Sequence, residues 1–437
     1  SSHQYNPMMI LADEHTTDSC GNCYAMSFVY SGNFKGEALK DQFGQTRALL
    51  GLQDEMFSYP LETGSVFYTP EVLLSFSGSG MNQLSQNLHR CIRQHICRGK
   101  YKESIRPILV NSWEAAYFDF DGDTLYELAK EAKNVGIDML VLDDGWFGKR
   151  DDDNSGLGDW FVNEKKLGGT LGSLIQKIND LGVKFGIWIE PEMISEDSDL
   201  YREHPDWALT IPGRNPVHAR NQLVLDFSRK EVVDHIFDQI CKVLDQGNIE
   251  YVKWDMNRNI TESYGTSLRA EQQGEFFHRY ILGVYDLYER LITDFPEILF
   301  ESCASGGARF DAGMLYYAPQ CWTSDDTDAV ERIKIQYGTS MAYPVSSMGA
   351  HVSAIPNHQV KRMTDVDFRA HVAYFGAFGY ELDPNAMTED EQEKVKEQIA
   401  FFKKYRKLIQ FGTFYRLEDP FEGDGNAAWM SVSPDKK

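Results

Sequence analysis

The sequence predicts an α/β protein whose main part is a (β/α)8 TIM barrel, with a smaller antiparallel β module on either side. From about residue 105, short apolar runs alternate with amphipathic segments, which is typical of parallel βα units. There are eight such runs, the number that closes a barrel. Polar and acidic residues gather late in these runs, and barrel proteins assemble their sites at the C-terminal ends of the strands. An open doubly wound sheet is the alternative, but no G-x-G-x-x-G segment follows the first run.

Residues 1–100 predict an antiparallel sheet followed by a helix. The segment is rich in aromatic residues, Thr, Ser and Gly, and stretches such as CYAMSFVYSG and VLLSFSGSG have the composition of strands. In MNQLSQNLHRCIRQHICRGK (81–100) apolar residues recur at helical spacing, so we expect a helical link to the barrel.

The eight apolar runs are, in chain order, RPILVNSW, DMLVLDDGW, KFGIWIEPEM, LVLDFS, YVKWDMN, LFESCASGG, QCWTSDD and SSMGAHV. Helices are expected between most of them, over residues 123–135, 170–181, 229–246, 271–294 and 328–341. Residues 365–410 are predicted to be mostly helical. From residue 412 strand and turn signals return, which predicts the first hairpin of another β module. That pattern is incomplete at the last residue, so we expect the chain to be part of a longer protein.

Composition limits the partners and the compartment. Sixty-six acidic and 43 basic residues give a formal net charge of −23, and this field repels nucleic-acid phosphates and anionic lipid surfaces. No apolar run reaches the roughly 18–20 residues that span a bilayer, and no signal peptide is apparent, although the chain lacks an initiator Met. Of the seven cysteines, Cys20 and Cys23 form a lone C-x-x-C pair, without a second pair for zinc. We therefore expect a cytoplasmic protein with reduced thiols, a neutral or cationic ligand, and neither nucleic-acid nor membrane partners.

The stretch YVKWDMNRN (251–259) places polar side chains on alternate positions of an otherwise apolar run. Side chains two apart on a strand point the same way, so Lys253, Asp255 and Asn257 would project together at the end of the strand. A lysine beside Asp255 favours the ionised carboxylate, which suits a nucleophile or a stabilising anion. The alternative is a structural ion pair at a strand end.

The stretch CWTSDDTDAVE (321–331) crowds three aspartates where a strand becomes a helix. Like charges so close raise the pKa of one carboxyl, and a protonated carboxyl facing an ionised one is what glycoside hydrolysis requires. Helix capping accounts for Asp328 and for one of the other two. Spacing alone does not decide whether Asp325 or Asp326 holds the proton.

Further candidates lie near other runs. Asp143 and Asp144 in VLDDGWFG can accept hydrogen bonds from two adjacent hydroxyls of a sugar. Arg220 in HARNQL can orient a carboxylate or a hydroxyl, and an ordinary surface arginine is the alternative. Aromatic rings stack on the apolar face of a sugar, and the aromatic candidates, which core packing would also explain, are Trp113, Trp146 and Trp188.

A metal site is the competing interpretation of these acidic residues, because carboxylates at strand ends also bind Mg²⁺. Metal-dependent barrels usually combine carboxylates with His or Lys in the mouth, and His351 is the only His late in a run. The SGG triplet (305–307) lacks the Lys of a phosphate-binding loop, so a tight turn explains it better. We expect neither a metal nor another cofactor.

Five motifs together resemble the bacterial α-galactosidases of glycoside hydrolase family 36. They are LDDGWFGKRDDDNSGLGDW, KFGIWIEPEM, YVKWDMNRN, FESCASGG and WTSDDTDAVERIKIQYGTSMAYPVSSMGAHVSA. The resemblance covers essentially the whole chain, with the motifs in consistent order. It implies a retaining exo-α-galactosidase that acts on melibiose and raffinose-type oligosaccharides, without a metal cofactor.

The resemblance also implies roles for individual residues. Asp255 matches the family's nucleophile, and Asp325 its acid/base. Asp143 and Asp144 match the pair that holds the hydroxyls on carbons 4 and 6 of galactose. The other positions that match the lining of the galactose pocket are Trp113, Trp188, Arg220, Lys253, Asn257 and Cys303.

Family members carry a large N-terminal β-sandwich domain and a C-terminal β domain around the barrel. By resemblance, residues 1–100 are the later part of the N-terminal β-sandwich domain plus the helical link. Residues 101–411 are the catalytic barrel, and 412–437 are the start of the C-terminal antiparallel β domain. Many members are tetramers, so a homo-oligomer is expected.

Four other functions compete with hydrolysis of α-galactosides. An α-galactosyltransferase or an α-N-acetylgalactosaminidase would use the same site. A metal-dependent isomerase or lyase would lose activity with EDTA, and a non-catalytic carbohydrate-binding protein would bind galactose without turnover.

Overall fold

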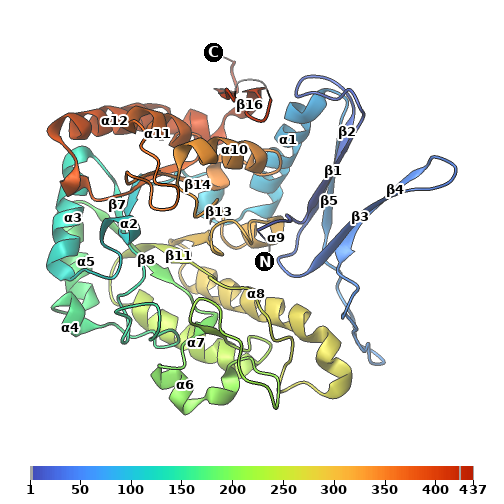
Figure 1. Cartoon of the computed structure of the whole chain (residues 1–437), viewed down its shortest axis with the longest axis horizontal. Coiled ribbons are helices and arrows are strands. Elements are labelled where there is room, and N and C mark those ends of the chain that lie inside the picture. Colours follow the sequence, from blue (N-terminus) through green and yellow to red (C-terminus); the bar gives the residue numbers. More distant parts are fainter. Residues whose placement is uncertain (1–2, 423–424, 437) are drawn as a thin grey trace.

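The computed structural model describes residues 3–422 and 425–436, and its centre is the predicted barrel (Figure 1). The eight barrel strands are parallel and pair in the order β6–β7–β8–β11–β12–β13–β14–β15, with β15 returning to β6. Their bounds are β6 (Leu109–Asn111), β7 (Met139–Leu142), β8 (Lys184–Ile189), β11 (Ile249–Trp254), β12 (Leu299–Ser302), β13 (Gln320–Trp322), β14 (Met348–Ser353) and β15 (Ala377–Glu381). An apolar cluster drawn from four of these strands packs inside the barrel, so the barrel is filled rather than open.

Seven of the eight predicted runs form barrel strands, and the prediction for the remaining one is wrong. The run LVLDFS contains only β10 (Leu223–Val224), which pairs antiparallel with β9 (Met193–Ile194) outside the barrel. The eighth strand is β15, which lies within residues 365–410, the stretch that the sequence pattern assigns mostly to helix. Every residue of β15 is buried, and so are both residues of β10. A short run buried on all sides has no periodicity that distinguishes a strand from other buried segments.

Five helices occupy the predicted segments: α3 (Gly122–Val135), α5 (Leu171–Asp180), α7 (Lys230–Leu244), α8 (Phe276–Asp294) and α10 (Ala329–Thr339). The further α-helices after residue 105 are α2 (Trp113–Ala116), α4 (Glu164–Leu167), α6 (Asp199–Glu203), α9 (Ala312–Leu315), α11 (Val366–Ala373) and α12 (Glu389–Phe411). Local signals set both ends of α3, since Asp121 accepts a hydrogen bond from the Thr124 amide at 2.8 Å and Gly136 follows with a φ of 98°. Within the described residues no helix is long and apolar enough to cross a membrane.

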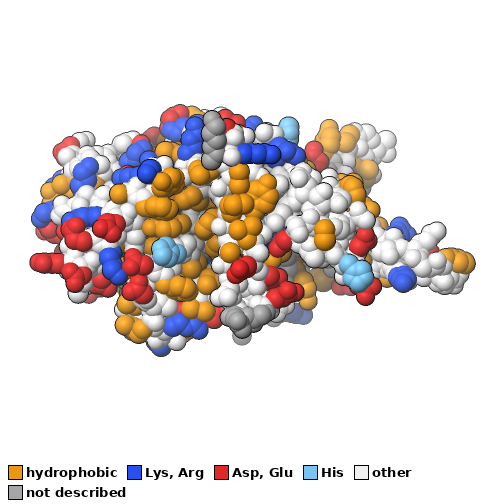
Figure 2. All heavy atoms as spheres, turned by 90° about the horizontal axis from the view of Figure 1, so that it is seen from above, with side chains coloured by type: hydrophobic (Ala, Val, Ile, Leu, Met, Phe, Trp, Pro, Cys, Tyr) orange, Lys and Arg blue, Asp and Glu red, His pale blue; other side chains and the backbone are white. Residues whose placement is uncertain are grey.

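The N-terminal β module packs against one side of the barrel (Figure 1). Strands β1 (Met8–Ala12), β2 (Cys23–Phe28) and β5 (Val72–Ser77) form an antiparallel sheet. The hairpin of β3 (Phe34–Lys40) and β4 (Thr46–Leu52) projects away from the body of the protein, as the view from above in Figure 2 also shows.

The segment predicted as a helical link forms α1 (Gly80–Cys91) and a π-helical turn (Ile92–Ile96). At the other end of the chain β16 (Thr413–Glu418) pairs with β17 (Ala428–Val432), as the strand signals predict. Asn82 on α1 exchanges hydrogen bonds of 2.8 and 2.9 Å with the backbone of Arg416 on β16. These bonds join α1 to the C-terminal hairpin of β16 and β17.

Candidate active site

A cavity of about 310 Å³ lies at the C-terminal ends of the barrel strands, and we call it the mouth cavity. Its lining includes nine of the ten residues to which the family resemblance assigns a role: Trp113, Asp143, Asp144, Trp188, Arg220, Lys253, Asp255, Asn257 and Asp325. These residues come from segments more than 200 positions apart in the chain, and barrel closure brings them together. The tenth of these residues, Cys303, does not line the cavity, and neither does the aromatic candidate Trp146.

Asp255 follows the last residue of β11, and four donors hold its carboxylate. Its Oδ2 accepts from Trp188 Nε1 at 3.2 Å and from Asn257 Nδ2 at 2.8 Å. Its Oδ1 accepts from the backbone amides of Met256 at 2.8 Å and Ser305 at 3.3 Å. The side chain is nearly buried, so these bonds fix the direction in which the carboxylate faces the cavity.

Asp325 follows β13 and differs from Asp255 in its surroundings. Its Oδ1 accepts one hydrogen bond, from Trp322 Nε1 at 3.0 Å. Burial, and next the negative charge of Asp255, raise the pKa of Asp325 to about 6. Asp325 therefore holds a proton at mildly acidic pH, while a second carboxylate lies in the same cavity.

The structure separates the three clustered aspartates where sequence spacing does not. Asp328 is the N-cap of α10, where its side chain accepts from the Glu331 amide at 3.2 Å, as the capping interpretation predicts. Asp326 Oδ1 accepts from the Asp328 amide at 3.1 Å, and Asp326 is not among the residues that line the mouth cavity. Asp325 is the member of the cluster that lines it.

Lys253 has a different partner from the one that the sequence predicts. Its Nζ lies 3.0 Å from Asp143 Oδ2, and Asn111 Nδ2 donates to the same oxygen at 2.6 Å. Burial alone would lower the pKa of Lys253, but the charge of Asp143 raises it well above its usual range. The prediction that Lys253 pairs with Asp255 is therefore wrong. The long lysine side chain extends from β11 to Asp143, which follows β7.

Asp144 is held by an arginine that sequence reasoning missed. Arg150 donates to Asp144 through Nε at 3.0 and 3.1 Å and through Nη2 at 2.8 Å, and both side chains are buried. Burial raises the pKa of Asp144, and the guanidinium of Arg150 opposes this shift. Arg150 lies in the loop after β7, and no periodic signal in the sequence marks it as a partner of Asp144.

Among the further glutamates that line the cavity, two lie at the ends of barrel strands and have no role assigned from the sequence. Glu190 directly follows β8, and Glu381 is the last residue of β15, the strand that the sequence pattern misses. Glu381 Oε2 lies 3.2 Å from His351 Nδ1. Burial would raise the pKa of Glu381, but the hydrogen bond from His351 and the charge of Lys253 lower it. Placement at the end of a buried run is the signal that would have identified both glutamates.

The remaining candidates occupy the rim, the core and the wall behind Asp255. Arg220 is exposed, and its Nη1 donates to Ser305 Oγ at 3.3 Å. Trp146 is fully buried and donates to the backbone oxygen of Trp188 at 2.9 Å, so it belongs to the core rather than to the cavity. Cys303 is also buried, and burial and the charge of Asp255 raise the pKa of its thiol well above the usual range.

The lining of the mouth cavity suits acid–base chemistry between two carboxyl groups. Asp255 has its orientation fixed, and Asp325 has a raised pKa. Among residues 3–422 and 425–436 no group of three or more His, Cys, Asp or Glu side chains is placed to hold a metal ion.

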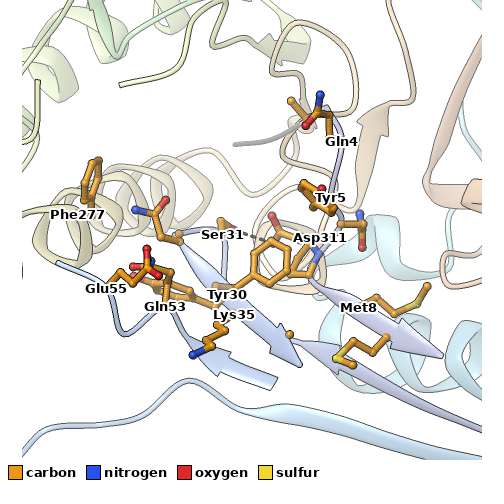
Figure 3. Close-up of a pocket in the computed structure, with 18 of the residues that line it drawn as sticks. Gln4, Tyr5, Met8, Tyr30, Ser31, Lys35, Gln53, Glu55, Phe277 and Asp311 are labelled. Atoms are coloured by element: carbon orange, nitrogen blue, oxygen red, sulfur yellow. Dashed lines mark hydrogen bonds between the residues drawn. The ribbon is translucent and has the colours of Figure 1, made fainter. Parts of the chain in front are cut away.

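A second cavity, of about 770 Å³, lies between the N-terminal β module and the barrel, and we call it the junction cavity (Figure 3). Asp311 lines it, and its Oδ1 accepts from Ser31 Oγ at 2.7 Å and from the Met314 amide at 2.8 Å. Burial raises the pKa of Asp311 to about 6. These bonds cap α9 and join it to the β module, which is a structural arrangement.

Models of two protein families match this chain. A model described as Melibiase matches residues 66–412, and a model of the glycosyl hydrolase family 36 N-terminal domain matches residues 1–62. These matches confirm the resemblance that the five motifs indicate.

Curated relatives match along the whole chain. The bifunctional α-galactosidase/sucrose kinase AgaSK of Mediterraneibacter gnavus is 61% identical over 436 residues, which are 100% of this chain and 46% of that protein. The α-galactosidase AgaA of Geobacillus stearothermophilus is 52% identical over 436 residues, which are 100% of this chain and 60% of that protein. The chain thus spans roughly half of the length of the curated relatives that it matches.

Solved structures of similar proteins share the fold. The galactosidase domain of AgaSK superposes with a TM-score of 0.96 at 61% identity, covering 100% of this chain and 59% of that one. A crystal structure of an AgaA variant from Geobacillus stearothermophilus in complex with raffinose superposes with a TM-score of 0.98 at 52% identity. The match covers 100% of this chain and 60% of that one.

Proposed function

This chain belongs to the melibiase family and to glycoside hydrolase family 36, and on that premise we propose that it is a retaining exo-α-galactosidase. Its substrates would be terminal α-galactosyl residues of melibiose and raffinose-type oligosaccharides. The observation that supports the proposal most is the pair of unlike carboxyl groups, Asp255 and Asp325, in one cavity.

In the proposed double displacement, Asp255 attacks the anomeric carbon while Asp325 gives its proton to the departing glycosidic oxygen. A β-galactosyl ester of Asp255 forms, and the aglycone leaves with that proton. Asp325, now ionised, takes a proton from water, which attacks the same carbon and releases α-galactose. An acceptor sugar in place of water would give transgalactosylation from the same intermediate.

Selectivity for galactose would come from Asp143 and Asp144, which hold the hydroxyls on carbons 4 and 6. The buried contacts with Lys253 and Arg150 keep both carboxylates in place before the sugar arrives. An equatorial hydroxyl on carbon 4 would leave a buried acceptor unpaired, at a cost of about 1–3 kcal/mol. This favours galactosides over glucosides.

The aromatic and rim residues would complete the sugar site. Trp113 and Trp188 line the cavity, Asn257 donates to the proposed nucleophile Asp255, and the exposed Arg220 also lines the cavity. Cys303 would act from behind Asp255 rather than by direct lining of the cavity.

The proposal also covers the organisation of the protein. We assign residues 1–100 to the later part of the N-terminal β-sandwich domain with its helical link, 101–411 to the barrel and 412–437 to the start of a C-terminal β domain. The assembly implied by the family resemblance is a homotetramer, which light scattering of the full-length protein would test. A cytoplasmic location fits the seven cysteines, all of which are free thiols.

The decisive test of the proposed function is proton NMR of an aryl α-galactoside during the first minutes of turnover by the full-length protein, before mutarotation. Release of α-galactose first is the expected result. Release of β-galactose first would overturn the double displacement and make Asp255 a base for water.

Product analysis separates the alternative activities. With a tenfold excess of acceptor sugar, hydrolysis should remain the main outcome, whereas a galactosyltransferase would give mainly the transfer product. Rapid turnover of an aryl α-N-acetylgalactosaminide in place of the galactoside would favour the N-acetylgalactosaminidase instead.

A further inference from the structure

Glu190 is a buried acid in the wall of the mouth cavity that the proposed mechanism does not use. It follows β8, and its side chain has no exposed surface. Its Oε1 accepts from Gln222 Nε2 at 2.8 Å and from the backbone amide of Asn257. Its Oε2 is buried and has no hydrogen-bond partner among the described residues.

This arrangement links Glu190 to the proposed nucleophile. The amide of Asn257 donates to Glu190, and the side-chain amide of the same Asn257 donates to Asp255 Oδ2 at 2.8 Å. Glu190 thus anchors the backbone of the residue that orients Asp255. A change at Glu190 would reach the carboxylate of Asp255 through a single intervening residue.

The charges around Glu190 favour its neutral form. Asp255 faces it from the end of β11 with a like charge. Arg150 attracts it from the loop after β7, but the guanidinium of Arg150 is bound to Asp144 and to the backbone oxygen of Ser155. Three other basic side chains line the cavity, and each has another partner. Lys253 pairs with Asp143, the exposed Arg220 donates to Ser305 Oγ at 3.3 Å, and His358 lies 3.1 Å from Glu114.

A buried carboxylate with no cation partner and one unbonded oxygen is unstable relative to the neutral acid. Burial, and then the charge of Asp255, raise the pKa of Glu190 to about 8. Since Oε1 already accepts two N–H groups, the proton belongs on Oε2.

We propose that Glu190 is a positioning residue that works as a neutral carboxylic acid. Its Oε1 anchors Asn257 behind Asp255, and its proton keeps a second negative charge away from the nucleophile. This inference rests on the proposed function, because it takes Asp255 as the nucleophile. When Glu190 ionises, the added charge repels Asp255 and competes with Asp144 for Arg150, so activity is lost.

The first experiment compares Glu190→Gln with Glu190→Ala in the full-length protein on an activated aryl α-galactoside at pH 6. Glutamine reproduces the neutral acid in shape and keeps the acceptor for Gln222 and Asn257. We expect Glu190→Gln to keep kcat/KM within about fivefold and Glu190→Ala to lose about 100-fold, mainly in kcat. Equal losses in both variants would overturn the proposal, because glutamate would then be required as an anion.

The second experiment isolates the titration of Glu190. The Asp325→Ala background removes the proposed acid, and an activated leaving group needs no proton, so kcat/KM can be followed from pH 6 to 10. We expect it to fall above about pH 8, and we expect the fall to disappear in the Asp325→Ala, Glu190→Gln double variant. A fall that persists in the double variant would overturn the proposal.

Two controls keep this result distinct from misfolding and from failure of the proposed function. Glu192 is bound to Arg309 at 2.7 and 3.0 Å in a buried ion pair, so Glu192→Gln should lower the melting temperature, whereas Glu190→Gln should not. If Glu190→Ala does not fold, the pH profile of kcat/KM in the variants with Glu190→Gln still tests whether Glu190 must be protonated. The anomer released by Glu190→Gln tests the proposed function separately, since β-galactose would reject the mechanism whatever the profile.

Discussion

The mouth cavity and the junction cavity each contain an aspartate whose pKa is raised to about 6, yet the two groups have different surroundings. In the junction cavity Asp311 Oδ1 accepts hydrogen bonds from Ser31 Oγ and from the amide of Met314 in the first turn of α9. Asp325 in the mouth cavity has a single indole donor, and the charge of Asp255 adds to the effect of burial. A raised pKa is therefore a sign of burial, and the second carboxylate is what makes it useful for catalysis.

Size does not identify the site either. The junction cavity is the larger, at about 770 Å³ against about 310 Å³. The mouth cavity is distinguished by convergent ion pairs, those of Lys253 with Asp143 and of Arg150 with Asp144. Volume measures room for a ligand, whereas chemistry requires charged groups held at fixed positions.

Replacement of Asp255 should have the largest effect. Asp255→Ala removes the proposed nucleophile, so kcat/KM should fall by about 10⁴–10⁶-fold for activated and unactivated α-galactosides alike. Steady-state kinetics with an aryl galactoside and with raffinose measure this. Asp311→Asn is the matched control in the junction cavity and should leave kcat/KM within about twofold. Comparable losses in the two variants would abolish the distinction between the cavities.

Replacement of Asp325 should separate substrates by their leaving groups. Asp325→Ala should lower kcat/KM about 10³-fold for raffinose but less than about tenfold for a dinitrophenyl galactoside, because a good leaving group departs without a proton. Competition between the two substrates measures the ratio directly. If both losses were equal, Asp325 would not be the acid.

The pH dependence should distinguish the two raised pKa values. The wild-type kcat/KM for raffinose should decline above about pH 6, since Asp325 must be protonated in the free enzyme to act as the acid. Asp311→Asn should leave this inflection where it is, although the pKa of Asp311 is also about 6. If the inflection moved in Asp311→Asn, the pH dependence of kcat/KM would reflect protonation of Asp311 in the junction cavity rather than protonation of Asp325.

The smallest effects concern stability at the junction cavity. Asp311→Ala loses two hydrogen bonds and should reduce the free energy of unfolding by about 1–3 kcal/mol, as urea titration would show. Asp311→Asn keeps both acceptor contacts and should be at least as stable as the wild type at pH 7.

The difference in stability between Asp311→Asn and the wild type should depend on pH in a definite direction. Burial raises the pKa of Asp311 from 3.8 to about 6 in the folded protein, so ionisation costs stability as the pH rises through this interval. Any advantage of Asp311→Asn should therefore vanish below about pH 4, where the wild-type carboxyl is also protonated. An advantage that persisted there would come from packing instead.

Much of the candidate site could be predicted from local pattern. Alternation along YVKWDMNRN predicts that Lys253, Asp255 and Asn257 project together, and all three line the mouth cavity. The position of Asp143 and Asp144 at the end of an apolar run likewise places them at the mouth. These predictions succeed because strand periodicity and strand ends are properties of a few neighbouring residues.

The misses involve buried or distant partners. The run LVLDFS and the strand β15 are both short and buried, so their apolar content does not tell which of them joins the barrel. With β15 the sequence pattern also misses the site position of Glu381. Arg150 has no local signature, because its role depends on Asp144. The position of Glu190 after β8 is a local signal, but its role depends on Gln222 and Asn257, which other parts of the chain supply.

The sequence by itself determined the barrel class, the collection of acids at its mouth and the family, because hydrophobic periodicity and long motifs are encoded locally. The tertiary structure alone decided that Lys253 pairs with Asp143 and that Trp146 is core. It also places Asp325 rather than Asp326 in the lining of the cavity, a choice that spacing leaves open and that only the family resemblance indicates. Those choices depend on distances across a closed barrel. Closure is a property of all eight strands together, and no single stretch of the chain contains it.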